Sequence, residues 1–391
     1  MELIDLSSKK SSIIVTCSKR IAPYLEQEIV ALGFSIVRTF ATGVELSGTM
    51  NDCIRLNLHL RCASQVLYSL RQFPANHPED VYKILLQMPW ENLLSNDGYF
   101  SITSNVDNPS VNNSLYVNVK VKDAIADRMR NKTGGRPNSG SSANGVVFHL
   151  FWRNEVAGIF IDTSGETLSR HGYRKIPGKA PMLESLAAAT LLATRWDRQS
   201  TFINPMCGSA TIAIEAALLA THRYPGLLRE NYSFMHVKGF DDDFYEKERA
   251  SLEQKIVEIP GLKIIATDIN EDAVNISKIN AGAAGVEKYI EFQKCSFEDT
   301  PITDDISGVI YFNPEYGERM GDEKELEETY ASIGDFMKKK CKGYTGYIFT
   351  GNLDLAKKIG LKPKRRIEFY TAKIDCRLLE YELYAGTRQA G

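Results

Sequence analysis

The chain of 391 residues lacks the marks of a membrane, secreted or metal-binding protein. No apolar run approaches the roughly 20 residues of a membrane-spanning helix, and the opening MELIDLSSKK has no apolar signal-peptide core. The seven cysteines include no C-x-x-C pair, so neither a zinc site nor a disulfide framework is indicated. We therefore expect a cytoplasmic protein without a metal, whose cysteines are small buried side chains.

The chain also lacks an excess of positive charge. Its net charge of −2 argues against a uniformly basic nucleic-acid binder, so any contact with RNA must use local cationic patches. The hydrophobic fraction of 43% is ordinary for a globular protein, and the length fits two or three domains. There is no internal repeat, and the one biased tract is a Gly/Ser-rich loop at 137–145.

The first half of the sequence predicts an α+β region. A strand at 13–17, a helix at 23–33 and strands at 34–40 and 43–47 suggest half of a ferredoxin-like unit. Apolar residues then recur at helical spacing through 51–70. Further elements are helices at 78–86 and 121–130, strands at 99–104 and 116–119, and a hairpin of 146–152 with 156–162. We expect domains at 1–50 and 51–165 and a linker at 166–182.

The second half, residues 183–391, changes to alternating helices and strands. We predict helices at 183–193, 211–220, 271–282, 323–340 and 353–360. Strands are predicted at 201–203, 263–267, 290–292, 306–311, 346–350, 366–372 and 376–384. This order predicts an α/β fold with a parallel, doubly wound sheet and an antiparallel pair at its edge.

A loop between a strand and a helix, Asn204–Thr211, has the residues of a cofactor site. Gly208, Ser209 and Ala210 are small enough for a ligand to approach the backbone, and the helix start offers N–H donors. Some sixty residues later a strand ends in Asp268, followed by Ile269, where a carboxylate can accept both hydroxyls of a ribose. Taken alone, Asp268 would read as a surface or helix-capping residue.

A second turn, Asn313-Pro314-Glu315-Tyr316, follows the strand predicted at 306–311. Pro314 fixes the backbone, so the Asn313 amide and the Pro314 carbonyl can accept two hydrogen bonds from one planar amine. Tyr316 can stack on the base that carries the amine, although a packed core tyrosine is the plainer alternative. Both turns lie at the carboxyl edge of one sheet, where such folds bind ligands. Because an Asn-Pro-x-Tyr turn suits an amine better than a phosphate, S-adenosylmethionine-dependent N-methylation fits better than redox chemistry.

Several motifs give the chain a resemblance to a known family. They are Arg170–Lys175 with 180–187, Asn204–Ala217, Asn313–Gly321, the tail segments Gly351–Leu353, Lys364–Arg366 and Cys376–Leu379, and the helix Val119–Arg130. On these residues the chain resembles the THUMP-domain class I methyltransferases of the UPF0020 type. It is especially similar to those that methylate guanine N2 of bacterial large-subunit rRNA.

The resemblance implies a Rossmann-like methyltransferase domain at 183–391, preceded by a ferredoxin-like part and a THUMP RNA-binding domain at 51–165. It implies catalysis by Asn313, Pro314 and Tyr316. It implies S-adenosyl-L-methionine contacts from Asn204, Pro205, Cys207, Gly208, Ser209, Thr211, Asp268, Ile269, Ser296 and Asn313.

The chain departs from the family pattern at four of these positions. Asn204 and Ser296 stand where many members have an acid, Ala210 replaces a glycine, and Glu315 replaces a second proline. The added methyl group of Ala210 is tolerated if φ is negative at this position.

Three cationic runs predict how structured RNA, such as rRNA or tRNA, is held. They lie at 120–136, 170–179 and 362–366. A single run of this kind is more often an ordinary solvent-exposed surface than a binding site. The expected RNA contacts are Lys120, Lys122, Arg128, Arg130, Arg170, Arg174 and Lys175.

Other functions fit the same residues. The Asn-Pro turn serves adenine N6 as well as guanine N2, and tRNA is an alternative to rRNA. The departures at Asn204, Ala210 and Glu315 also suit a non-catalytic RNA chaperone or assembly factor. The sequence does not indicate the oligomeric state.

Overall fold

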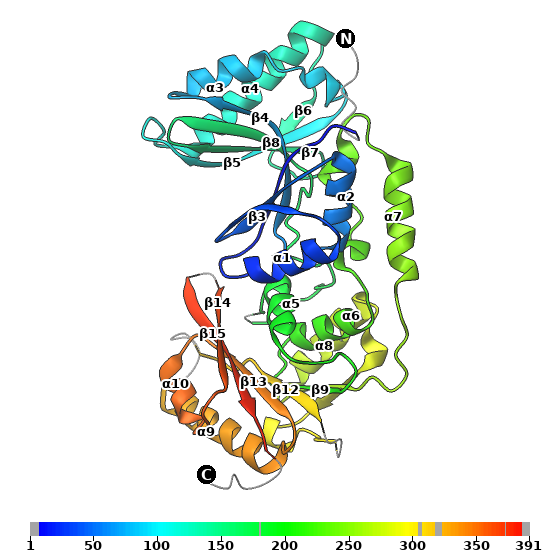
Figure 1. Cartoon of the computed structure of the whole chain (residues 1–391), viewed down its shortest axis with the longest axis vertical. Coiled ribbons are helices and arrows are strands. Elements are labelled where there is room, and N and C mark those ends of the chain that lie inside the picture. The colour runs from blue at the N-terminus through cyan, green and yellow to red at the C-terminus, as the bar shows by residue number, and fades with distance from the viewer. Residues whose placement is uncertain (1–7, 180, 304–306, 317–322, 372, 385–391) are drawn as a thin grey trace. The chain divides into compact units, whose positions relative to one another are not determined.

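The computed structural model describes residues 8–179, 181–303, 307–316, 323–371 and 373–384. Contacts divide the chain into two compact units, each with its own β-sheet (Figure 1). The first unit contains the chain up to Cys17, Leu25–Leu168 and Arg229–Glu253. The second contains Ser18–Tyr24, Ser169–Leu228 and the chain from Gln254 onward.

The first unit has an eight-stranded sheet of order β2-β3-β1-β4-β8-β7-β5-β6. Strand β4 joins its two halves, because it pairs with β1 on one side and with β8 on the other. The strands are β1 (Ser11–Thr16), β2 (Ile36–Phe40), β3 (Gly43–Gly48), β4 (Gln65–Pro74), β5 (Tyr99–Asp107), β6 (Asn138–Gly140), β7 (Val146–Arg153) and β8 (Val156–Asp162).

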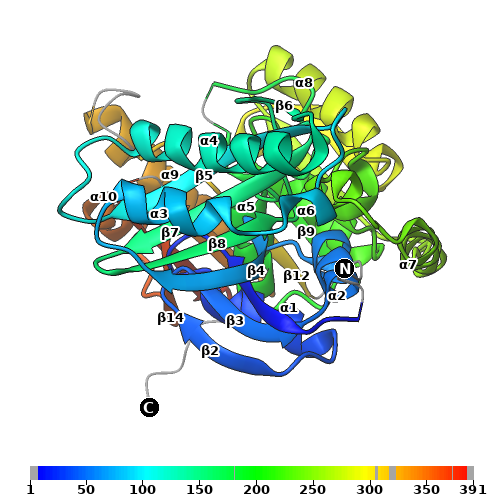
Figure 2. The same ribbon diagram turned by 90° about the horizontal axis from the view of Figure 1, so that it is seen from above.

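Helices α3 (Pro78–Leu86) and α4 (Ser114–Thr133) lie side by side on one face of this sheet (Figure 2). The chain also forms α1 (Ala22–Ala31), α2 (Met50–His59), α7 (Asp242–Gln254) and the 3-10 turns η1 (Trp90–Asn92) and η3 (Ser233–His236). Of these, α7 was not predicted from the sequence.

Two sequence predictions for the first unit are wrong. The helical pattern at 51–70 holds through α2, but Val66 and Leu70 lie on strand β4. Their spacing of four residues fits one face of a strand as well as one face of a helix. The strand predicted at 116–119 is part of α4, because Val117, Val121 and Ala124 are buried at helical spacing and override the local β preference.

The second unit has a seven-stranded sheet of order β11-β10-β9-β12-β13-β15-β14. Strands β11, β10, β9, β12 and β13 are parallel, and β15 runs antiparallel between β13 and β14. This arrangement confirms the predicted doubly wound sheet with an antiparallel edge. The strands are β9 (Thr201–Pro205), β10 (Ile264–Asp268), β11 (Ile290–Lys294), β12 (Gly308–Phe312), β13 (Thr345–Thr350), β14 (Arg365–Thr371) and β15 (Ile374–Glu382).

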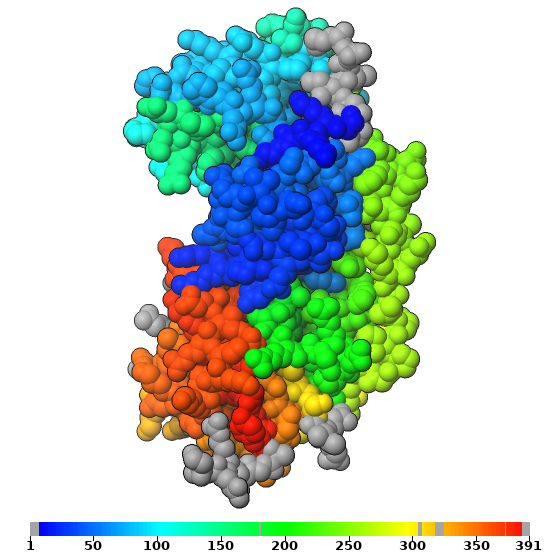
Figure 3. Space-filling model, viewed as in Figure 1, coloured from blue at the N-terminus to red at the C-terminus, as the bar shows by residue number. Residues whose placement is uncertain are grey.

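Helices cover both faces of this sheet. Ile310 and Phe312 of β12 share a buried core with α9 (Glu323–Lys340) and α10 (Leu353–Lys358), while Tyr311 points to the other face, toward Thr190 of α5 (Glu184–Ala193). Helix α6 (Thr211–Ala220) packs against α5, and α8 (Glu271–Ala283) against β10 and β11. The last strands, orange to red, form a continuous part of the surface in Figure 3. Strands β9, β10 and β12 are buried on both faces, which explains why their sequences are apolar runs.

Candidate active site at the carboxyl edge of the second sheet

The two predicted turns follow neighbouring strands. Ile203 of β9 is paired with Ile310 of β12, so the cofactor loop after β9 and the Asn-Pro turn after β12 begin side by side. The Asn204 amide nitrogen donates to the Tyr311 carbonyl at 3.0 Å and ties the two strand ends together. The strand order reverses between β9 and β12, and open α/β sheets bind their ligands at such a point.

The cofactor loop has an unusual backbone. Met206, Gly208 and Ala210 have φ values of 53°, 57° and 55°, so the negative φ at which a methyl group is easily tolerated is not present at Ala210. The loop is held by bonds from the Cys207 N–H to the Thr267 carbonyl at 2.9 Å and from the Ala210 N–H to the Cys207 carbonyl at 2.8 Å. A left-handed alanine costs about 1–2 kcal/mol, which these surroundings must offset.

Asp268 braces this loop from the end of β10. Its two carboxylate oxygens accept from the backbone N–H groups of Gly208 and Asn270, each at 2.9 Å. A carboxylate has about four acceptor positions, so about two remain for the hydroxyls of a ribose. The next side chain, Ile269, is 72% exposed and offers an apolar surface beside the carboxylate.

The start of α6 supplies hydrogen-bond donors. Ala210 is its N-cap and gives no side-chain capping bond, so the first N–H groups depend on other acceptors. Ser209 is buried beside Thr211, with 3.4 Å between their hydroxyl oxygens, and no atom lies within 4 Å of the position that a Cβ would take at Gly208. Free space over backbone N–H donors suits an anionic group.

The remaining predicted cofactor residues lie around this loop. Pro205 ends β9 and is buried, and Ser296 is partly buried directly before the 3-10 turn Phe297–Asp299. Burial raises the pKa of the Cys207 thiol to about 12, so this side chain remains protonated at neutral pH.

The Asn-Pro turn leaves an acceptor unused. Asn313 Oδ1 is buried and has no hydrogen-bond partner among the described residues. Pro314 is buried. The Tyr330 hydroxyl of α9 donates to the Glu315 carbonyl at 3.3 Å and so helps to fix the turn. An unpaired buried acceptor costs about 1–3 kcal/mol, which a ligand that donates to it would recover.

Tyr316 is fixed by packing and is partly exposed. Its ring lies edge-on to Phe349, with 6.2 Å between the centroids, and a Cβ at Gly351 would come within 2.9 Å of it. Burial raises the pKa of the Tyr316 phenol, so the ring stays neutral. Residues 317–321 of the predicted motif, Ala180 of the linker motif and Ile306 lie outside the described residues.

The linker holds a buried cluster that the sequence analysis missed. His171 Nδ1 lies 2.7 Å from Glu215 Oε1, and both side chains are fully buried. Arg174 donates to Thr211 at 2.9 Å and lies 3.4 Å from Glu184. The signal was present in the sequence, because Glu184 and Glu215 are single charges within the apolar helices α5 and α6.

The linker also contacts the cofactor loop and α8. The N–H groups of Lys175 and Ile176 donate to Asn280 Oδ1 at 2.9 and 3.2 Å, and Asn280 donates back to the Ile176 carbonyl at 3.0 Å. A Cβ at Gly178 would lie 3.4 Å from Ser209. Residues 171–178 therefore pack beside the cofactor loop, which the sequence did not indicate.

Two predicted RNA contacts are only partly exposed and already pair with carboxylates of the chain. Arg174 is 15% exposed and belongs to the buried cluster, and Arg128 is 17% exposed and binds both oxygens of Glu91, at 2.6 and 3.1 Å. The carboxylates that pair with these arginines lie on other elements. A run of cationic residues in the sequence therefore does not show that its charges are paired.

The other predicted cations are more accessible, but most have carboxylate partners. Lys120 pairs with Glu79, Lys122 lies 3.9 Å from Asp123, and Arg130 lies 3.0 Å from Asp127. Arg170 and Lys175 are exposed.

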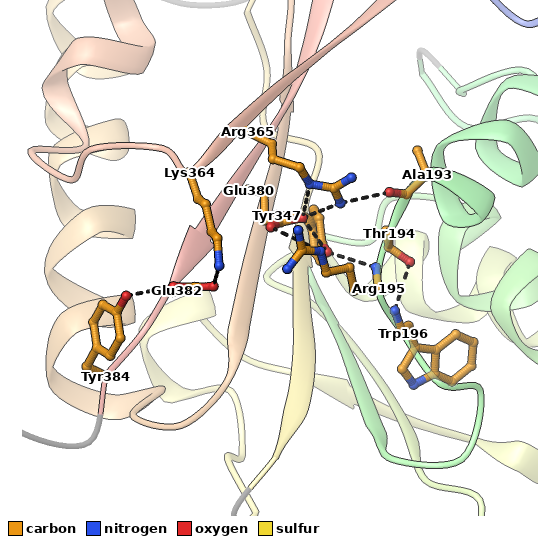
Figure 4. Close-up of polar contacts among 10 residues, drawn as sticks. All are labelled: Ala193, Thr194, Arg195, Trp196, Tyr347, Lys364, Arg365, Glu380, Glu382 and Tyr384. Carbon is orange, nitrogen blue, oxygen red and sulfur yellow. Dashed lines mark hydrogen bonds and ion pairs between the residues drawn. The ribbon is translucent and has the colours of Figure 1, made fainter. Parts of the chain in front are cut away.

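The run at 362–366 is compensated in the same way. Figure 4 shows Lys364 paired with Glu382, and Arg365 paired with Glu380, whose side chain is fully buried. Tyr347 also donates to Glu380 at 2.9 Å.

The described residues offer neither a metal site nor a membrane-spanning helix. They contain no group of three or more His, Cys, Asp or Glu side chains arranged to hold a metal ion. None of their helices has the length and apolar character needed to cross a bilayer.

Fold and site together define a Rossmann-like methyltransferase domain preceded by ferredoxin-like and THUMP domains. Family models place an RlmL ferredoxin-like domain at residues 12–67 and a THUMP domain at 75–162. The chain belongs to the UPF0020 family, the RMKL-like methyltransferase domain, whose model matches residues 171–380.

Two curated relatives share a name and match nearly the whole chain. Ribosomal RNA large subunit methyltransferase K/L of Syntrophotalea carbinolica is 32% identical over 94% of this chain and 53% of its own length. The Pseudomonas fluorescens protein of that name is 30% identical over 95% and 50%. The chain thus spans about half the length of the curated relatives it matches.

Solved structures share the fold over nearly the whole chain. A methylase structure from Listeria monocytogenes, titled as N6-adenine-specific for DNA, is 27% identical over 98% of this chain and 99% of its own, with a TM-score of 0.86. SMU.472, complexed with SAH, is 24% identical over 97% and 100%, with a TM-score of 0.87, and shows the fold alone.

Proposed function

We propose that the protein is an S-adenosylmethionine-dependent RNA methyltransferase that methylates guanine N2 in large-subunit rRNA. The observation that carries the proposal is the buried Asn313 Oδ1 beside Pro314, which has no hydrogen-bond partner in the part of the chain that the structure describes and lies where the strand order reverses. The names of the curated relatives, which are rRNA methyltransferases, support the choice of substrate.

The residues of the loop fit the cofactor. The uncapped start of α6 suits its carboxylate, Asp268 suits its ribose, and Ile269 gives an apolar surface for its adenine. When bound, this cofactor supplies an electrophilic methyl group on a sulfonium.

The Asn-Pro turn would then orient the amine. The guanine N2 lone pair is delocalised into the ring, so the nitrogen is a weak nucleophile. If its two N–H groups donate to Asn313 Oδ1 and the Pro314 carbonyl, the nitrogen is drawn toward tetrahedral geometry and its lone pair faces the methyl group. Such positioning can supply about 7–11 kcal/mol of a barrier. Tyr316 would stack on a base taken out of its helix, and the methylated nitrogen would release its proton to water.

Two measurements test the proposal. Calorimetric titration of S-adenosylmethionine into the full chain should show binding at one site; no binding would favour a non-catalytic RNA-binding assembly factor. Mass spectrometry of nucleosides from the rRNA and tRNA of a deletion strain should show loss of N2-methylguanosine from large-subunit rRNA. Loss of N6-methyladenosine instead would overturn the choice of base.

A further inference from the structure

A cavity of about 240 Å³ opens where the two halves of the first sheet join. The pairing of β1 with β4 reaches Ile13 and Tyr68, and β4 then continues to Pro74 beside β8. The register of β4 shifts between Ser69 and Arg71, which marks a β-bulge in the cavity wall. Bulges often re-aim side chains next to binding sites.

Two buried aromatic side chains support the wall of the cavity. Tyr68 and Trp90 are 1% and 0% exposed. The Tyr68 hydroxyl donates to the Lys9 carbonyl at 2.8 Å, and the Trp90 indole N–H donates to the Leu85 carbonyl at 2.7 Å, so both rings are fixed in place. The apolar surface that a ligand can reach comes from Leu70 and Pro89, which are partly exposed.

The rim of the cavity is polar and cationic. Gln87 and Asn92 contribute amide groups, Lys9 and Arg71 contribute positive charges, and no carboxylate lines the cavity. Lys9 and Arg71 are exposed and have no ion pair within the described part of the chain. This distinguishes them from Lys120, Arg128 and Arg130 of α4, which all pair with carboxylates.

We propose that this cavity binds one unpaired nucleotide of the RNA, with the base inside and its phosphate on Lys9 and Arg71. The volume is below the roughly 300–1,000 Å³ typical of drug-sized sites, which suits a single planar base. Proteins read unpaired bases by apolar contact and by hydrogen bonds to their edges, which the two amides can supply. The site rests on the proposed function in taking RNA as its ligand, and it is independent of methyl transfer.

Charge reversal in the full-length protein tests the phosphate contact. The probes are two fluorescein-labelled RNA hairpins whose strands are joined by a non-nucleotide linker, one fully paired and one with a single-nucleotide bulge, measured by fluorescence anisotropy. Arg71→Glu and Lys9→Glu should each weaken binding of the bulged hairpin about tenfold and lower the salt slope by about one. Lys247→Glu, an exposed cation of α7 in the same unit, is the matched control and should change neither value.

Filling the cavity separates the base from the phosphate. Asn92→Trp should weaken the bulged hairpin about tenfold without changing the salt slope, since a base contact is worth about 5- to 150-fold in affinity. Asn92→Ala keeps the cavity open, and its thermal unfolding shows whether the position tolerates substitution. Equal losses for both hairpins would overturn the nucleotide pocket in favour of a backbone contact, and no loss for either would overturn the site altogether.

Calorimetry of the same variants separates the two proposals. Wild type and pocket variants should bind S-adenosylmethionine equally. If none of them binds the cofactor while the bulged hairpin still depends on Arg71, the enzyme assignment fails and the nucleotide pocket stands.

Discussion

The cofactor loop and the Asn-Pro turn lie at the ends of neighbouring strands but are built in opposite ways. In the loop, positive φ values lead into the start of α6, whose first N–H groups have no side-chain cap, and Asp268 braces the backbone. In the turn, Pro314 has no N–H, Tyr330 holds the Glu315 carbonyl, and Asn313 Oδ1 has no partner among the described residues. The first turn presents donors and the second presents acceptors.

This difference explains how one sheet edge can serve two ligands. Donors at a helix start favour a negatively charged ligand, and fixed acceptors favour an amine. Variants of the two turns should therefore fail in different assays, one in cofactor binding and the other in turnover.

The largest effect is expected from Asn313→Ala. Removal of the unpartnered acceptor should lower kcat about 100- to 1,000-fold, as the loss of one preorganised hydrogen-bonding group does in other enzymes. Binding of S-adenosylmethionine should change little. Single-turnover methylation and calorimetry measure the two quantities, with Asn275→Ala, exposed on α8, as the control. Equal losses in both assays would erase the distinction between the turns.

Asp268→Ala should show the opposite pattern. Charge-assisted bonds are worth about 1.5–3 kcal/mol, so the Kd for S-adenosylmethionine should rise about 10- to 100-fold. The rate at saturating cofactor should fall much less. The control is Asp272→Ala, at the exposed start of α8. A selective loss of kcat would place this carboxylate with the acceptor turn instead.

Gly351→Ala should disturb the acceptor turn alone. Its Cβ would come within 2.5 Å of Ile374 and 2.9 Å of the Tyr316 ring, so the ring must shift. Because small displacements at a reacting centre are costly, we expect kcat to fall about tenfold while cofactor binding persists. In the control, Gly282→Ala, the nearest atom to the added Cβ is a Glu287 oxygen at 3.4 Å. Unchanged kcat would show that the position of Tyr316 does not matter.

Ala210→Gly should give the smallest effect and reports on the strain of the donor loop. Glycine removes about 1–2 kcal/mol of strain from the left-handed backbone. It also makes the unfolded chain more flexible and removes a buried methyl group, and both effects destabilise the folded state. The free energy of unfolding should therefore rise by less than about 1 kcal/mol. Ala213→Gly, buried inside α6, should lower it by about 1 kcal/mol or more. Chemical denaturation measures both. If Ala210→Gly is as destabilising as Ala213→Gly, the loop is not strained.

Much of the fold could be predicted, because helix and strand periods are local properties. The hairpin of β7 and β8 and the alternation after residue 183 were predicted correctly. Val66 and Leu70 were assigned to a helix because a spacing of four residues fits both the helix and the strand period. Tyr116 was assigned to a strand because its local β preference differs from the helix α4 in which it lies.

Much less of the electrostatics could be predicted. The residues of both turns were identified, but the partners of Arg128 and Arg174 lie on other elements. The sequence gives the number of charges, and ion pairing depends on which side chains the fold brings together.

The sequence alone determined the order of the βα units and the chemistry of the two turns, since each lies within a few consecutive residues. Tertiary structure decided that the turns are neighbours, that Ala210 has a positive φ, and that residues 171–178 wall the loop. It also decided which cations stay unpaired. These features depend on distances between residues far apart in the chain, which no local pattern records.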